Sequence, residues 1–109
     1  QSLPQVQFLE AAHEQEHCLE TQLPWLQCKL DSFWIIPLVV GLATPEAVAE
    51  VLDLVWDTKT LVVVSSDLSH YLNDTDARIA DAGTCCKIEH LDYAHLAPEE
   101  ACGARAIAG

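Results

Sequence analysis

Two uninterrupted apolar runs are the feature that most constrains the fold of this chain. They cover residues 33–41 and 60–65, and neither contains a charged side chain. Short apolar runs rich in β-branched residues are typical of strands that are buried on both faces of a parallel sheet. Pro37 lies inside the first run and removes one backbone donor, so we expect that strand to border a bulge or a sheet edge.

Helix signals separate and follow these runs. Thr44-Pro45-Glu46 provides a cap, a proline at the first helical position and an acid in the first turn. Apolar spacing predicts helices over residues 8–20 and 73–91, and Pro98-Glu99-Glu100 predicts the start of another. Alternation of strand and helix implies parallel strands with right-handed crossovers. The sequence therefore predicts an α/β fold with a largely parallel sheet and flanking helices.

The helix predicted over residues 73–91 is amphipathic. We expect its apolar side chains to face a core and its charged side chains to face solvent. The predicted inward positions are Ile79, Ala82, Ile88 and Leu91, and the predicted outward positions are Arg78, Asp81, Lys87 and Glu89.

Composition excludes several classes of partner. Seventeen Asp and Glu against five Lys and Arg give a net charge of −12, which argues against binding to nucleic-acid phosphates or to an anionic membrane surface. The longest apolar stretch, residues 33–43, is too short to span a bilayer. The five cysteines are odd in number and show no C-x-x-C spacing, so we expect reduced thiols and a cytoplasmic protein.

A polar cluster follows the second apolar run. Residues 65–71 read Ser-Ser-Asp-Leu-Ser-His-Tyr, and open α/β sheets gather their ligands beyond the carboxyl ends of the strands. Polar side chains in that place would be costly to bury without a purpose. The alternative is a polar turn in which the serines and Asp67 cap the next element.

A second cluster, His13-Glu14-Gln15-Glu16-His17, satisfies the H-E-x-x-H pattern of zinc metalloproteases. Such a site needs a third ligand downstream and a helix of several turns. We expect this helix to end soon after Glu20, because Pro24 follows. The pattern is therefore interpreted as two histidines at the exposed, acidic start of a helix, with a zinc metalloprotease as the weaker alternative.

Several blocks of the chain resemble the Memo family, which includes AmmeMemoRadiSam system protein B. Residues 16–26, Glu-His-Cys-Leu-Glu-Thr-Gln-Leu-Pro-Trp-Leu, resemble a family signature, and residues 63–71 match the family's Ser-Ser-Asp-hydrophobic-Ser-His block. Residues 36–41, 89–92 and 101–103 continue the resemblance in the same order. It implies that residues 1–109 are the central part of a single Memo-like domain whose N- and C-terminal parts are missing.

The Memo family in turn resembles class III extradiol ring-cleaving dioxygenases, which hold non-haem iron in an α/β fold. Carried over residue by residue, the resemblance implies that His17 and Cys102 are metal ligands. It implies that His70 is the catalytic acid or base, with Asp67 beside it as a ligand-binding residue. The family's first histidine has no counterpart in this chain. The implied cofactor is iron, with copper or zinc as alternatives.

Two functions follow as expectations. One is an iron- or copper-binding redox role in a dioxygenase-like pocket, with His17, Asp67, His70 and Cys102 lining that pocket at the end of the strand formed by residues 60–65. The other is a non-catalytic module that binds a peptide or a small molecule on the same fold. Unpaired strand edges also predict a homo-oligomer or a sheet that lacks its outer strands.

Overall fold

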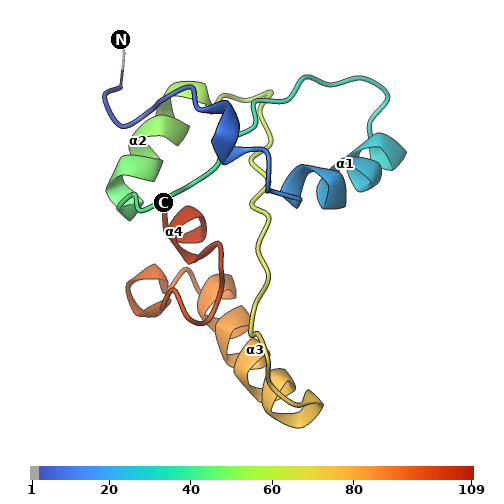
Figure 1. The fold of residues 1–109 in the computed structure, drawn as a ribbon, viewed down its shortest axis with the longest axis vertical. Coiled ribbons are helices and arrows are strands. Elements are labelled where there is room, and N and C mark those ends of the chain that lie inside the picture. The colour runs from blue at the N-terminus through green and yellow to red at the C-terminus, as the bar shows by residue number, and fades with distance from the viewer. Residues whose placement is uncertain (1–2) are drawn as a thin grey trace.

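The structure is a computed structural model that describes residues 3–109, and its regular elements are helices (Figure 1). In chain order they are η1 (Glu10–Ala12), α1 (Cys18–Lys29), α2 (Pro45–Val55), α3 (Asp74–Glu89), η2 (Tyr93–His95) and α4 (Ala104–Ala108). Helix α3 extends away from the other helices, and residues 60–70 run as a single extended trace towards its start (Figure 1). No helix of residues 3–109 is long and apolar enough to cross a membrane.

The predicted α/β fold with a parallel sheet is wrong for the described residues, because residues 3–109 contain no strand. A strand exists only where its backbone pairs with a neighbour. Within residues 3–109, no backbone hydrogen bond joins residues 33–41 or 61–65 to another segment. Both apolar runs are irregular, and most of their side chains are exposed to solvent. Trp34, for example, is 99% exposed.

Two helices are confirmed where the sequence carries capping residues. In α2, the Thr44 hydroxyl accepts a hydrogen bond from the backbone N–H of Ala47 at 3.3 Å, and Pro45 opens the helix. In α3, the Asn73 side chain accepts from the backbone N–H of Asp76 at 3.0 Å. These side chains satisfy donors that would otherwise be unpaired in the first turn.

The other two helix predictions are wrong. Within residues 8–20, Glu10–Ala12 form the 3-10 helix η1 and residues 13–15 form a turn, and α1 begins only at Cys18 and continues through Pro24. A proline inside a helix removes the hydrogen bond that its own N–H would donate, and α1 continues past this single loss. Pro98 lies in a turn, and the following helix, α4, begins only at Ala104.

The buried core of the described residues is small. It consists of Val48 on α2, Thr84 on α3, Ala101 in the loop before α4, and Ala104 at the start of α4. Helices α2 and α4 pack against each other, and η2 contacts both α3 and α4. Arg105 reinforces this packing, because its guanidinium donates to the carbonyl oxygen of Ala43 at 2.9 Å.

Helix α3 does not present the apolar face that the sequence predicts. Ile79 and Leu91, both predicted to face inward, are exposed. Asp81 and Lys87, both predicted to face outward, are half-buried and bind other segments. The helix therefore packs mainly through polar contacts, which a hydrophobic pattern cannot reveal.

Candidate functional site

Cys102 and Asp67 are joined by a reciprocal pair of hydrogen bonds. The backbone N–H of Cys102 donates to the carbonyl oxygen of Asp67 at 3.1 Å. The backbone N–H of Asp67 donates to the Cys102 Sγ at 3.1 Å. The loop before α4 is thereby fixed against the end of the extended segment, although the two residues are 35 positions apart.

Ser66 and Gly103 extend this contact. The backbone N–H of Gly103 donates to the Ser66 Oγ at 2.8 Å, and the same oxygen lies 3.7 Å from the Cys102 Sγ. A Cβ at position 103 would lie 2.7 Å from the Ser66 Cβ, so this approach requires glycine. Sequence reasoning included Ser66 in the polar cluster and Gly103 in a resemblance block, but it assigned neither residue a role in the site. The signal that the sequence offered was their position, because Ser66 directly precedes Asp67 and Gly103 directly follows Cys102.

His70 lies beside Asp67. Its Nε2 is 3.5 Å from the Asp67 Oδ2, and about half of the imidazole is exposed. Tyr71, the next residue, has a φ of 60° and turns the chain towards α3. A left-handed conformation is uncommon for a residue with a bulky side chain. The predicted capping role for this cluster is not seen, because Asn73 caps α3.

Asp81 on α3 holds the segment that carries Asp67 and His70. Its carboxylate accepts a hydrogen bond from the backbone N–H of Ser69 at 2.9 Å. That bond holds the pKa of Asp81 below its ordinary value, because it stabilises the charged carboxylate. One carboxylate of α3 therefore fixes the position of the Asp67–His70 turn.

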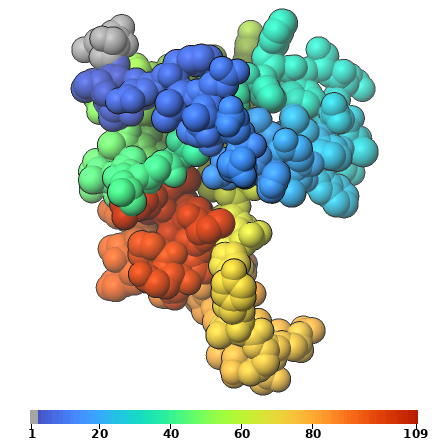
Figure 2. Space-filling model, viewed as in Figure 1, coloured from blue at the N-terminus to red at the C-terminus, as the bar shows by residue number. Residues whose placement is uncertain are grey.

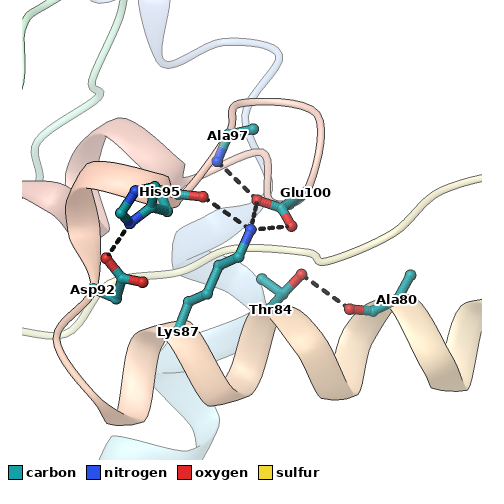
Figure 3. Close-up of polar contacts among 7 residues, drawn as sticks. All are labelled: Ala80, Thr84, Lys87, Asp92, His95, Ala97 and Glu100. Atoms are coloured by element: carbon teal, nitrogen blue, oxygen red, sulfur yellow. Dashed lines mark hydrogen bonds and ion pairs between the residues drawn. The ribbon is translucent and has the colours of Figure 1, made fainter.

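Lys87 on α3 holds the segment that leads to Cys102 (Figure 3). Its ammonium donates to the Glu100 carboxylate at 2.6 and 2.7 Å and to the His95 carbonyl oxygen at 2.9 Å. Glu100 also accepts from the backbone N–H of Ala97 at 2.9 Å. The hydrogen bonds from Lys87 and Ala97 hold the pKa of Glu100 below its ordinary value.

His17 is not brought into this cluster. It is the exposed residue that precedes α1, and its carbonyl oxygen accepts from the backbone N–H of Thr21. Within residues 3–109, no hydrogen bond joins its side chain to Asp67, His70 or Cys102. Helix α1 instead contacts the extended segment through Gln22, whose amide donates to the Ser65 Oγ at 3.2 Å.

The H-E-x-x-H match lacks the helix that it needs. Residues 13–15 form a turn, and α1 begins only at Cys18. His13 and His17 therefore do not lie one turn apart on one helix face. Both are exposed, as the preferred interpretation required; His13 lies in the turn and His17 directly precedes α1.

Metal ligands are not gathered in the part of the chain that the structure describes. No group of three or more His, Cys, Asp or Glu side chains among residues 3–109 could hold a metal ion. A pocket of about 310 Å³ adjoins Cys102 and is also lined by Val40, Gly41, Leu42, Gly103, Arg105 and Ala106. Cys102 is the one predicted site residue that lines this pocket.

The family model for Memo-like proteins matches residues 2–104. The chain is 36% identical over 94 residues to a MEMO1 family protein of Metallosphaera sedula, a match that covers 80% of this chain and 33% of the relative. It is 38% identical over 79 residues to a MEMO1 family protein of Archaeoglobus fulgidus, covering 67% of this chain and 30% of that relative. No solved structure matches.

These matches extend along most of the sequence, whereas the chain spans only about a third of the length of the curated relatives. The paired contacts around Cys102 and Asp67 fall inside the matched region. The resemblance seen in the sequence blocks is thereby confirmed: this chain belongs to the Memo family.

Proposed function

We propose that, within a whole Memo-family protein, this chain supplies the thiolate end of an iron- or copper-dependent redox site. The observation that carries the proposal is the contact between Cys102 and Asp67, in which one backbone N–H approaches the sulfur at 3.1 Å. It brings a thiol against the backbone of Asp67, a residue distant in sequence whose carboxylate lies 3.5 Å from the His70 imidazole. Thiolate and imidazole ligands suit iron, copper or zinc better than magnesium or calcium.

The side chains present are of the chemical type that binds such an ion, but too few of them lie together in the described residues to hold it. Cys102 would be a metal ligand, but the described residues provide no group of three donors. His17 would have to move towards Cys102, or further ligands would have to come from other sequence. A bound iron or copper would supply electron transfer to a ligand in the pocket beside Cys102.

The chain's own residues would orient and protonate that ligand. His70 presents a half-exposed imidazole that can hold or release a proton at its Nε2, and the Asp67 carboxylate at 3.5 Å orients the ring. Ser66 and Gly103 fix the loop that carries the sulfur. His70 is thus proposed to move protons, while Cys102 binds the ion.

Cobalt(II) titration tests the proposal, because cobalt bound to a thiolate gives a charge-transfer absorption band. We expect the band when this chain is part of a whole Memo-family protein and its loss there in Cys102→Ser, with metal affinity at least about 10–100-fold weaker. Cys28→Ser is the matched control, because Cys28 is also an exposed free thiol but lies on α1. His70→Ala should retain the band. An unchanged band in Cys102→Ser would refute the metal site.

A non-catalytic binding module is the second candidate function. The absence of a three-donor group among residues 3–109 favours it, as does the pocket of about 310 Å³ beside Cys102 and Arg105. If the whole Memo-family protein and its Cys102→Ser variant bind iron, copper and zinc with equally low affinity, this candidate replaces the redox site.

A further inference from the structure

Helix α3 carries a thiol and an imidazole one turn apart at its C-terminal end. Cys86 and His90 are four residues apart, and side chains at that spacing are neighbours on a helix surface. The Cys86 Sγ lies 3.6 Å from the His90 Nδ1, and both residues are exposed. Figure 2 shows α3 and the segment before it projecting from the body of the molecule. The pair is therefore open to solvent, and it shares no residue with the contact between Cys102 and Asp67.

The backbone fixes the turn that brings the two side chains together. The N–H of His90 donates to the carbonyl oxygen of Cys86 at 3.1 Å and closes the last turn of α3. Leu91 follows with a φ of 55°, and its N–H donates to the carbonyl oxygen of Ile88 at 3.1 Å. A left-handed residue in this place ends a helix, so no further helical turn covers the His90 imidazole.

The distance between the two donor atoms suits a single metal ion. A tetrahedral ion with bonds of about 2.3 Å to a thiolate sulfur and about 2.0 Å to an imidazole nitrogen holds these atoms about 3.5 Å apart. The observed separation of Sγ and Nδ1 is 3.6 Å. Thiolate and imidazole ligands favour borderline-soft ions such as Zn²⁺ over Mg²⁺ or Ca²⁺. The net charge of −12 also attracts cations to this chain.

One hydrogen bond competes with an ion for the imidazole. The His90 Nδ1 also lies 2.8 Å from the carbonyl oxygen of Cys86, and a neutral ring with its proton on Nδ1 donates to that oxygen. An ion at Nδ1 requires the other tautomer, which carries the proton on Nε2. Since the carbonyl oxygen and the sulfur belong to the same residue, the ring can exchange one contact for the other without leaving its place.

We propose that Cys86 and His90 form a two-ligand site for Zn²⁺, with water at the remaining coordination positions. The Cys86 thiolate and the His90 Nδ1 bind the ion, and the exposure of both residues leaves room for water. Two protein ligands bind an ion more weakly than the four of a structural zinc site. The pair therefore fills at higher metal concentrations than the site proposed around Cys102 in a whole Memo-family protein, and it does not depend on that site.

Protection of thiols from alkylation tests the site. The 109-residue chain is treated with iodoacetamide in the presence and absence of zinc chloride, and mass spectrometry follows Cys85 and Cys86 separately. The free thiolate is the nucleophile, so we expect bound zinc to slow the alkylation of Cys86 at least about 10-fold. Cys85 is the matched control thiol, because it is also free and exposed but lies about 100° around the helix. Its alkylation rate should not change.

A pair of histidine variants identifies the nitrogen ligand. His90→Gln should need about 10–100-fold more zinc for the same protection of Cys86. His95→Gln should leave the protection unchanged, because His95 is also exposed but lies on η2, where its Nδ1 pairs with Asp92. Cys102→Ser should leave it unchanged as well, because the two sites share no ligand. All of these substitutions replace exposed side chains, so the helix content seen by circular dichroism should stay the same.

Three results would overturn the proposal. Alkylation of Cys86 that saturating zinc does not slow would show that no ion binds its thiolate. Equal slowing at Cys85 would show that the effect does not come from this pair. Full protection of Cys86 in His90→Gln at the original zinc concentration would exclude the imidazole as a ligand.

Discussion

Gly103→Ala tests whether the contact between the two loops of the site is as close as the structure shows. An alanine Cβ would lie 2.7 Å from the Ser66 Cβ, 2.9 Å from the Ser66 Oγ and 3.1 Å from the Ser65 carbonyl oxygen. Carbon atoms pack at about 3.5–4.0 Å, so the loops must separate by about 1 Å. The φ of Gly103 is −88°, so backbone strain adds nothing.

The expected cost is about 1–3 kcal/mol of unfolding free energy, the usual range for overpacking. Separation of the loops would also weaken the bond from the Gly103 N–H to the Ser66 Oγ and the bond from the Cys102 N–H to Asp67. Urea denaturation followed by circular dichroism measures the first effect. Hydrogen exchange at the Cys102 amide measures the second and should become faster.

Gly83→Ala is the matched control, because nothing lies within 4 Å of its added Cβ and it sits inside α3. An alanine in a helix interior is more favourable than glycine by about 1 kcal/mol, so this variant should be more stable. Both substitutions add one methyl group, but Gly103→Ala is expected to lower the free energy of unfolding and Gly83→Ala to raise it. A Gly103→Ala chain with unchanged stability and unchanged exchange at Cys102 would refute the close contact.

Three further predictions concern individual side chains. Thr44→Ala should cost about 1 kcal/mol through loss of the α2 cap, measured by urea denaturation, with Thr58→Ala neutral. Asp81→Ala should speed hydrogen exchange at the Ser69 amide, whereas Asp53→Ala on α2 should not; equal rates would contradict the role of Asp81. The pKa of Glu100 lies below its ordinary 4.5, so the stability that its carboxylate contributes is present above pH 4.5 and is lost as pH falls through the lower folded-state pKa. Glu100→Gln should therefore lessen acid destabilisation below pH 4.5 in acid titrations, whereas Glu99→Gln should leave it unchanged.

The parts of the fold that the sequence predicted are those with local causes. Helices α2 and α3 begin where Thr44 and Asn73 can cap their first turns, and those caps need only neighbouring residues. The prediction of a sheet was wrong for the opposite reason, because strand pairing depends on segments that are distant in sequence. Apolar runs such as residues 33–41 favour a strand only if another segment supplies the matching backbone, and residues 3–109 contain no such segment.

The site residues were predicted from resemblance rather than from local pattern, and their roles stay predictions. Asp67 contacts both His70 and Cys102, but nothing in their local sequence shows that they meet. Asp81 and Lys87 were assigned to solvent because charged residues on a helix usually face water. Their partners, the Ser69 amide and Glu100, are contributed by distant segments that no helical pattern can reveal.

Helix α3 therefore determines how the two halves of the site meet. Asp81 holds the Ser69 amide next to His70, while Lys87 holds Glu100 next to Cys102, and the two are separated by about 9 Å of helical rise. The buried apolar core is too small to replace these two contacts in fixing the loops. Since both contacts depend on ionised carboxylates, acid should loosen the Cys102–Asp67 contact through α3. The protection of the Cys102 amide from hydrogen exchange, relative to an unstructured amide at the same pH, should therefore fall as the pH is lowered, and unchanged protection would contradict this role of α3.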